Sequence, residues 1–304
     1  MSEGWTLRRA HGGYPRQLLD LDGLAGERAP AQLFGRGSRE LVAGLEAGKA
    51  VTIVGARRCS GYGRAVAAEL AGSLAAAGLV VVSGMAFGID QAAHRGALDA
   101  GGLTLAVLAG GPDRAYPPSS RSIHRRIMAS GGAVVSESAP GYAPHRFDFP
   151  RRNRIMAALA AMTIVVEARD PSGSRITADR ALELSREVGA LPGPVTSPLS
   201  AGPHALIRDG AHLVRDAQDV LDQVLGVGAR FAERVGPELD EDSERTLAVV
   251  GTGESFDSVA AGAALDAART AVALARLELL GYVRAEAGRY ARTGLVPPPA
   301  HPAA

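Results

Sequence analysis

Short apolar runs alternate with longer amphipathic stretches between residues 50 and 225. Each run is too short for an ordinary helix and ends near glycine or a polar residue, which is typical of a buried strand. Strands that alternate with helices predict an α/β domain with a mostly parallel sheet and helices on both faces. The expected strands are 50–54, 79–82, 104–108, 133–135 and 163–166; the expected helices are 65–77, 91–100, 120–129, 154–161 and 176–188, followed by a last unit at 212–225.

The pattern changes after this domain, which we place at 49–225. Residues 226–241 have no clear periodicity and are expected to be a linker. Beyond them come three short helical stretches (243–250, 255–262 and 266–280) and two short strands around a glycine turn (282–292). This order predicts a winged-helix domain at 242–293, and the Pro/Ala-rich residues 294–304 are expected to be disordered.

Residues 1–48 are less informative. They hold one candidate strand at 32–34 and one candidate helix at 38–47. We expect a short N-terminal extension that covers the edge of the sheet without forming a core of its own.

The composition is that of a globular protein, with 46% hydrophobic and 21% charged residues. The net charge of +1 excludes a uniformly basic DNA-coating protein but allows a local basic site. No apolar run is long enough to span a membrane, and the N-terminus has no apolar signal core. The single cysteine, Cys59, excludes an internal disulfide and a thiolate metal site, so a cytoplasmic location is expected.

Two glycine-containing loops are candidate anion sites, because each follows a strand and precedes a helix. The first is VGARRCSGYG, where Gly55, Gly61 and Gly63 allow close backbone approach. The loop does not indicate a dinucleotide site. A dinucleotide-binding fold has an Asp or Glu at the end of the second strand, where it binds the ribose hydroxyl, and this chain has Ser83 and Gly84 there. The second loop is EARDPSGSRITADRAL, with Gly173, Ser174 and Thr177 around a helix start. Simple turn formation and helix capping are the alternatives for these loops.

The most basic stretch is HRFDFPRRNR, residues 145–154. Arginines interleaved with aromatic rings suit single-stranded nucleic acid, because phosphates bind the guanidinium groups and unstacked bases bind the rings. The alternative is a solvated helix start whose two phenylalanines anchor it to the core. The stretch contains Arg146, Arg151, Arg152 and Arg154, with Phe147 and Phe149 between them.

No catalytic or metal-binding motif emerges from the sequence. Asp90 and His94 lie four residues apart, but we interpret Asp90 as a helix-start residue bonded to local N–H groups. There is no G-x-S-x-G or H-E-x-x-H motif. We therefore expect no enzymatic activity, no metal and no cofactor.

Taken together, these loops resemble the DNA-processing protein A family (DprA, also called Smf). The similar segments occur in the family's order and extend over about residues 14–225. They are VGARRCSGYG, SGMAFGIDQAAHRGAL, LAGGPDRAYP, VVSE, FPRRNRIMAAL, VVVEARDPSGSRITADRAL, ALPGP and GPHALIRDGAHLV. One departure is Arg175, which stands where the family usually has an apolar residue.

The resemblance implies an extended Rossmann-like domain that acts as a homodimer, binds single-stranded DNA and loads RecA recombinase onto it during natural transformation, without nucleotide hydrolysis. It also implies site residues. Arg57, with Gly55 and Gly63 in the same loop, would bind a phosphate. Arg152, Asn153 and Arg154 would line the DNA pocket, with Arg151 on its rim. Gly173, Ser174 and Thr177 would bind a further phosphate, and Phe147 and Phe149 would stack on bases.

Two other functions remain open at this point. A nucleotide-binding protein or nucleoside-phosphate hydrolase on a related fold would have only Glu137 and Glu167 as candidate general acid or base. A transcription regulator would use the winged helix, but its longest helix offers only Arg269 and Arg276 for duplex DNA.

Overall fold

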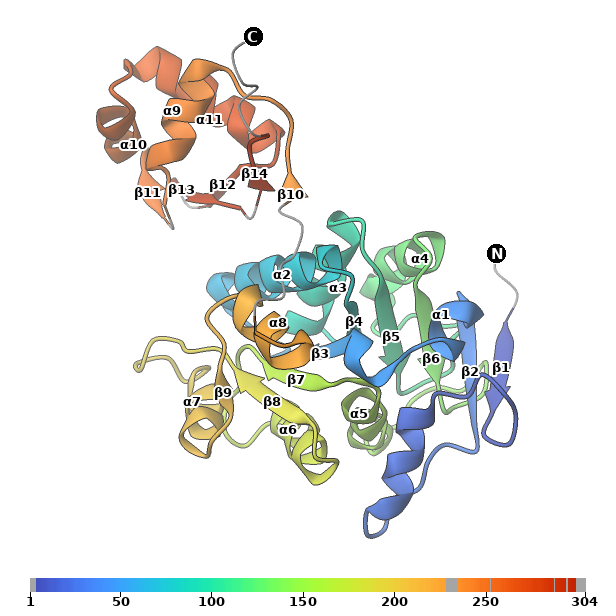
Figure 1. Cartoon of the computed structure of the whole chain (residues 1–304). Coiled ribbons are helices and arrows are strands. Elements are labelled where there is room, and N and C mark those ends of the chain that lie inside the picture. Colours follow the sequence, from blue (N-terminus) through green and yellow to red (C-terminus); the bar gives the residue numbers. More distant parts are fainter. Residues whose placement is uncertain (1–3, 228–233, 252, 287, 294, 299–304) are drawn as a thin grey trace. The chain divides into compact units, whose positions relative to one another are not determined.

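The computed structural model describes residues 4–227, 234–251, 253–286, 288–293 and 295–298 (Figure 1). The chain divides into two compact units, residues 1–231 and 232–304. The division falls inside the range that the sequence predicts to be a linker, of which residues 228–233 lie outside the described residues.

The first unit is built on a nine-stranded sheet in the order β1-β2-β6-β5-β4-β3-β7-β8-β9. Neighbouring strands from β6 to β9 are parallel, whereas β2 is antiparallel to both β1 and β6. The mostly parallel α/β sheet predicted from the sequence is confirmed. The strands are β1 (Trp5–Arg8), β2 (Gln32–Gly37), β3 (Ala50–Val54), β4 (Val80–Ser83), β5 (Thr104–Leu108), β6 (Ala133–Ser136), β7 (Met162–Val165), β8 (Glu187–Ala190) and β9 (His212–Leu213).

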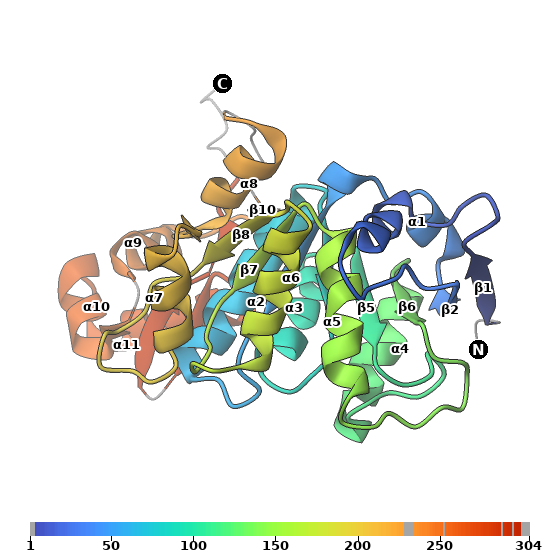
Figure 2. The same ribbon diagram turned by 90° about the horizontal axis from the view of Figure 1, so that it is seen from below.

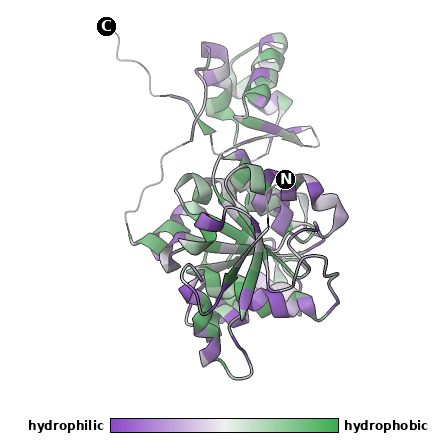
Figure 3. Ribbon diagram, turned by 90° about the vertical axis from the view of Figure 1, so that its right-hand side faces the viewer, coloured by the Kyte–Doolittle hydropathy of each residue, from purple (hydrophilic) through white to green (hydrophobic). Residues whose placement is uncertain are grey.

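The helices are α1 (Arg39–Ala43), α2 (Gly61–Ala76), α3 (Ile89–Asp99), α4 (Arg121–Ala129), α5 (Asp148–Leu159), α6 (Gly173–Glu183), α7 (Ala201–Arg208) and α8 (Ala217–Leu225), with short 3-10 turns at Arg16–Gly23 (η1), Ala47–Lys49 (η2) and Pro118–Ser120 (η3). Successive strand residues belong to different core clusters, since side chains along a strand alternate between faces. In β3, Ala50 and Val54 pack with α5 and α6, whereas Val51 and Ile53 pack with α2, α3 and α8. Helices therefore cover both faces, as Figure 2 shows, and hydrophobic strands occupy the centre of the unit in Figure 3.

The N-terminal residues are part of this unit. Strand β1 and the 3-10 turn η1, which the sequence pattern does not predict, add to the sheet edge and to the core. Leu7, Leu18, Leu21 and Leu33 are each at most 2% exposed and belong to the same core cluster as α5 and α6. The N-terminal segment therefore contributes to the core, whereas the sequence predicts only that it covers the edge of the sheet.

Several helices differ from the sequence-based prediction. The helix predicted at 154–161 is wrong at its N-terminal end, because α5 begins at Asp148. Helix α2 starts four residues early, because Ser60 caps it by accepting a hydrogen bond from Gly63 N (2.9 Å). The helix predicted at 176–188 is wrong at its C-terminal end, since Ser185 has a φ of +55° and the chain then forms β8. Helix α7 is missed altogether.

The second unit is the winged helix predicted from the sequence. Its elements are β10 (Arg234–Val235), α9 (Glu241–Val249), β11 (Glu254–Ser255), α10 (Phe256–Ala263), α11 (Ala267–Leu279), β12 (Val283–Glu286), β13 (Arg289–Arg292) and β14 (Leu295–Val296). The three helices enclose a core that includes Leu247, Leu274 and Tyr282, and β12, β13 and β11 form a small antiparallel sheet. Strand β14 lies within the tail expected to be disordered; residues 294 and 299–304 of that tail lie outside the described residues.

Among the helices of the described residues, none alone has the length and apolarity needed to cross a membrane. The pair α10 and α11, bent by 106°, would meet that requirement together by length and composition only. Within the same residues, no three His, Cys, Asp or Glu side chains gather where they could hold a metal ion.

Candidate nucleic-acid interface

The carboxyl ends of β3 and β7 meet where the chain order in the sheet reverses. From β3 the chain builds β4, β5 and β6 on one side, and later β7, β8 and β9 on the other. A reversal of this kind leaves a crevice beyond the strand ends, which is the usual ligand site of open α/β sheets. A cavity of about 630 Å³ lies there, lined by the loops after β3, β4, β5, β6 and β7 and by parts of α3, α5 and α6.

The buried carboxylate of Glu167 holds the loop after β3 in place. Its two oxygens accept hydrogen bonds from Ser60 N (2.9 Å) and Ser60 Oγ (2.5 Å), and its backbone carbonyl accepts one from Ala56 N (2.6 Å). A Cβ on Gly63 would lie 2.3 Å from this carboxyl group. Gly63 therefore allows α2 to pack on Glu167. It does not line the cavity, although the sequence analysis places it in the phosphate-binding loop. Gly55, in the same loop, does line the cavity.

Arg57 and two aromatic rings form one wall of the cavity. The exposed Arg57 guanidinium lies 5.1 Å from the centroid of the Phe149 ring, a cation–π distance. The Phe149 and Tyr116 rings are 5.4 Å apart between centroids. Arg57 forms no ion pair with any described carboxylate. The wall thus combines a free guanidinium with ring surface that a planar base can contact.

Arg152 lies at the floor of the cavity and is only 6% exposed. Its Nη1 donates hydrogen bonds to the carbonyl oxygens of Gly84 (2.8 Å) and Val107. A Cβ on Gly84 would lie 2.3 Å from Nη1, so only glycine allows this contact. Burial lowers the pKa of Arg152 to about 10, opposed by the charge of Asp90. Arg152 therefore stays protonated at neutral pH.

Asp90, at the start of α3, also lines the cavity and is 4% exposed. Its Oδ2 accepts hydrogen bonds from Gly84 N (3.1 Å) and Ala86 N (3.3 Å), which confirms the interpretation of Asp90 as a residue bonded to local N–H groups. Burial raises the pKa of Asp90 to about 6, against the opposing charge of Arg152. His94 bonds through Nδ1 to Thr104 Oγ1 (2.7 Å), and burial lowers the pKa of His94 to about 3. The two side chains thus have separate structural partners.

The N-terminal turn of α6 forms the opposite wall. Ser172 caps the helix by accepting a hydrogen bond from Arg175 N (3.3 Å), so α6 begins at Gly173, three residues earlier than predicted. Gly173, Ser174 and Thr177 all line the cavity. The first backbone N–H groups of a helix have no partner within it and attract anions. The geometry of this wall suits a phosphate group; that it binds one stays a prediction.

Asn153 connects the floor to that wall. Its Oδ1 accepts a hydrogen bond from Arg152 Nε (3.2 Å), and its Nδ2 donates one to the carbonyl of Gly173 (3.2 Å). The amide therefore orients the guanidinium and the first turn of α6 relative to each other.

Helical periodicity decides which residues of the basic run reach the cavity. Within α5, Phe149, Arg152, Asn153 and Met156 line it at the i, i+3, i+4 and i+7 spacing of one helix face, with Pro150 beside them. Arg146, in the loop before α5, also lines it. Arg151 and Arg154 lie on other faces of α5 and do not line it. The structure therefore does not bring these two arginines to the cavity lining, where the sequence-based prediction placed them.

Arg154 instead ties α5 to the N-terminal region. Its side chain is 4% exposed and pairs with Glu27 (3.3 Å) and Glu137 (2.7 Å), and Arg151 pairs with the other oxygen of Glu137 (3.0 Å). Phe147 is also outside the cavity, 66% exposed and stacked on His145 with ring centroids 5.6 Å apart. It is neither a core anchor nor part of the cavity wall.

Sequence reasoning missed Tyr116, Asp90 and Ser172 as cavity residues. Their positions after the carboxyl ends of β5, β4 and β7 are the signal that could have identified them. Arg175, singled out as a departure from the family pattern, pairs with Asp179 (3.3 Å) and Asp209 (3.0 Å) and does not line the cavity.

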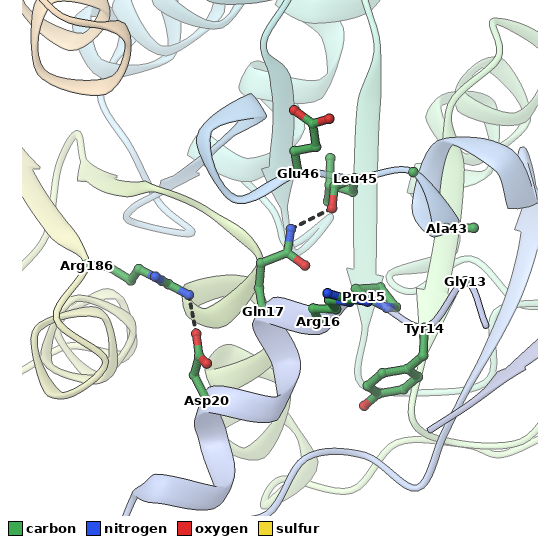
Figure 4. Close-up of a pocket in the computed structure, with 11 residues that line it drawn as sticks. Gly13, Tyr14, Pro15, Arg16, Gln17, Asp20, Ala43, Leu45, Glu46 and Arg186 are labelled. Atoms are coloured by element: carbon green, nitrogen blue, oxygen red, sulfur yellow. Dashed lines mark hydrogen bonds and ion pairs between the residues drawn. The ribbon is translucent and has the colours of Figure 1, made fainter. Parts of the chain in front are cut away.

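A second cavity, of about 520 Å³, lies beside η1 (Figure 4). Gln17 Nε2 donates to the carbonyl of Leu45 (2.6 Å), and Arg186 pairs with Asp20 (2.5 Å). Leu45 shortly precedes β3 and Arg186 directly precedes β8, so this cavity is near the amino ends of the strands. Because ligands of such sheets bind at the carboxyl ends, we place the candidate site in the first cavity.

Comparison with known proteins identifies a family. Residues 5–225 match the family model described as DNA recombination-mediator protein A. A DprA homologue of Mycobacterium tuberculosis is 44% identical over 249 residues, 80% of this chain, and the match spans 64% of that relative's length. Protein Smf of Escherichia coli is 35% identical over 293 residues, 92% of this chain and 75% of the relative.

Two solved structures are similar to most of the chain. The X-ray structure of DprA from Streptococcus pneumoniae has a TM-score of 0.65 and 40% identity, covering 72% of this chain and 74% of that one. DNA processing protein A from Helicobacter pylori, described for its single-stranded DNA binding mode, has a TM-score of 0.60 and 27% identity, covering 74% of this chain and 98% of that one.

Proposed function

Because the chain belongs to the DNA recombination-mediator protein A family, we propose that it binds single-stranded DNA in the cavity above β3 and β7 and loads a RecA-type recombinase onto the bound strand. The processes it would serve are DNA uptake in natural transformation and recombination. The DNA-binding mode described for the Helicobacter pylori relative supports the first step of this proposal.

The observation that carries the proposal is the pairing of cations with aromatic rings on one wall of the cavity. Arg57 lies over Phe149, which contacts Tyr116, while Arg152 supplies a fixed charge below them. A phosphate between Arg57 and the first turn of α6 would receive both a guanidinium and backbone N–H groups. The phosphate contacts proposed for Arg57, Gly173, Ser174 and Thr177 are thus close enough to act in one site.

The rings favour a single strand over a duplex. Stacking on Phe149 or Tyr116 needs a base that has left its own stack, and only a single strand offers such bases at little cost. Phe147 and its neighbour His145 present a further exposed ring outside the cavity. Binding should therefore be salt-sensitive and nearly independent of sequence.

The carboxylates near the site favour binding over catalysis. Glu167 accepts hydrogen bonds from the loop after β3, and Glu137 pairs with Arg151 and Arg154. A general acid or base needs a carboxylate that can reach a substrate, and neither of these lines the cavity. Asp90 does line it, but its Oδ2 accepts hydrogen bonds from the backbone N–H groups of Gly84 and Ala86, so we assign this carboxylate to the support of the loop after β4. We therefore propose a non-enzymatic role and do not favour the nucleoside-phosphate hydrolase.

The assembly and the partner follow from the family resemblance. We propose a cytoplasmic homodimer that contacts RecA directly. The test is a loading assay, in which the rate of RecA-driven strand exchange is measured on single-stranded DNA already coated with single-strand-binding protein. The full chain should increase this rate. Binding to the DNA without any increase would leave a DNA-protecting protein and contradict the loading role.

A further inference from the structure

Next to the DNA cavity, an exposed aromatic ring lies outside its walls. Tyr62, in the first turn of α2, is 52% exposed and does not line the cavity. Its hydroxyl donates a hydrogen bond to the carbonyl of Pro192, in the loop after β8 (3.4 Å). The ring is thus fixed at one end while much of its surface stays accessible to solvent.

Exposed arginines without acidic partners accompany this ring in the sequence. Arg58 and Arg64 flank Tyr62, and Arg169 follows β7. None of the three forms an ion pair or side-chain hydrogen bond with another described residue. Elsewhere in the first unit some exposed arginines, such as Arg151 and Arg215, are paired with carboxylates, whereas others, such as Arg39 and Arg95, have no such partner among the described residues. An unpaired guanidinium is available to bind phosphate without first breaking an ion pair.

This surface is continuous with the cavity through the backbone. Arg58 directly follows Arg57, which belongs to the cavity wall. Arg169 is two residues beyond Glu167, whose carbonyl and carboxylate bond to the loop that carries Arg57 and Arg58. Arg58 and Arg169 are thus connected to the cavity wall by the backbone and by Glu167, and the Tyr62 hydroxyl reaches the loop after β8. We call Arg58, Tyr62, Arg64 and Arg169 the α2 surface.

We infer that the α2 surface is a second contact region for the same single strand, with Tyr62 stacking on a base and Arg58 and Arg169 binding phosphates. The inference rests on the proposed function and extends it from one pocket to a longer binding path. The chemistry favours a nucleic acid strand because the surface combines free cations with one accessible ring. A duplex would offer no unstacked base to Tyr62, and an apolar protein partner would leave three cations unpaired.

The test compares a short and a long oligo-dT on the full chain by fluorescence anisotropy. Lengths of roughly 4 and roughly 16 nucleotides bracket known single-strand site sizes. Tyr62→Ala should weaken binding of the long oligonucleotide by about fivefold or more, the lower range for loss of one stacked base, and leave the short one unchanged. Tyr62→Phe keeps the ring and should bind the long oligonucleotide like the unaltered chain. Tyr62→Leu, similar in bulk but not aromatic, should behave like Tyr62→Ala.

The arginines have a separate readout in the salt dependence. Replacing both Arg58 and Arg169 with glutamine should reduce the slope of log affinity against log salt by about 1.4 for the long oligonucleotide, which is about 0.7 for each phosphate that the variant no longer neutralises. The slope for the short oligonucleotide should not change. Arg39→Gln and Arg95→Gln, at exposed positions on α1 and α3, are matched controls that should leave both slopes unaltered.

The outcomes separate this inference from the proposed function. If Tyr62→Ala binds both oligonucleotides like the unaltered chain, the α2 surface does not contact the strand. If it weakens both equally, Tyr62 acts by supporting the cavity, and the inference is also wrong. If it changes only recombinase loading, the surface serves a protein partner instead. The DNA-binding part of the proposed function fails if the unaltered chain binds neither oligonucleotide, and the loading part fails if the strand-exchange rate does not increase.

Discussion

Replacing Arg57 with alanine tests the cavity with little risk to the fold. The side chain is exposed and has no ion pair within the described part of the chain, so its removal leaves no buried charge. It would remove one phosphate contact and one cation–π contact with Phe149 at 5.1 Å. A hydrogen bond to a charged group contributes about 1.5–3 kcal/mol, and an exposed cation–π pair about 0.5–1 kcal/mol.

The cation–π contact between Arg57 and Phe149 already exists in the protein without DNA, so its loss adds little to the change in binding free energy. We therefore expect binding to weaken by about 2 kcal/mol, mainly from the lost phosphate contact, or roughly 30-fold in affinity. The slope of log affinity against log salt should also fall by about 0.7. Both are measured by anisotropy with labelled oligo-dT between about 50 and about 200 mM salt.

Arg151→Ala is the matched control for Arg57→Ala. It removes an exposed arginine close in the fold that pairs with Glu137 and points away from the cavity. Exposed ion pairs contribute about 0–1 kcal/mol, so its affinity should change little. The reasoning is refuted if Arg57→Ala binds with unaltered affinity and slope, or if Arg151→Ala weakens binding as much as Arg57→Ala.

Three further predictions concern stability. Arg154→Met removes the buried cation between Glu27 and Glu137, which keep Arg180 and Arg151 as partners, and should lower the free energy of unfolding in urea by about 1–3 kcal/mol. The oligo-dT affinity should not change, and a large drop in affinity would show that Arg154 contributes to DNA binding. Gly63→Ala places a Cβ 2.3 Å from the Glu167 carboxyl group and should destabilise the fold by about 1–3 kcal/mol, seen as a lower Tm. The pKa of Asp90 rises from 3.8 to about 6 on folding, so its ionisation opposes folding as the pH increases through this range. The free energy of unfolding of Asp90→Asn, relative to that of the unaltered chain, should therefore increase by about 2–3 kcal/mol as the pH rises from about 4 to about 7. If this difference in unfolding free energy does not depend on pH, the pKa assigned to Asp90 is contradicted.

Much of the fold follows from patterns visible in the sequence. The strands β3, β5 and β7 are nearly continuous apolar runs, because both faces of a central parallel strand are buried. Strand β8 reads Glu-Val-Gly-Ala, which has little strand propensity of its own. It becomes a strand because Gly189 fits closely against Met162 and Val214, contacts between distant parts of the chain that no local pattern encodes.

The candidate site is predicted less completely, and the basic run shows why. Once α5 is known to start at Asp148, helical periodicity predicts that Arg152 and Asn153 lie on the face toward the cavity and that Arg151 lies on another face. The start itself is hard to predict, because no side chain caps this helix. Arg154 is buried against Glu27, which lies 127 positions earlier in the chain. No local pattern shows this pairing, so an arginine that the basic run assigns to DNA has a structural role instead.

The most direct test of the account is to locate the bound strand by photo-crosslinking. A single-stranded oligonucleotide carrying 5-iododeoxyuridine at each position in turn would be irradiated with the full chain, and the crosslinked peptides identified by mass spectrometry. We predict crosslinks on the peptides that contain Tyr116 and Phe149, whose rings line the cavity. Crosslinks confined to Tyr14, beside the cavity at the amino ends of the strands, or to Tyr282 and Tyr290 of the winged helix, would contradict the central claim.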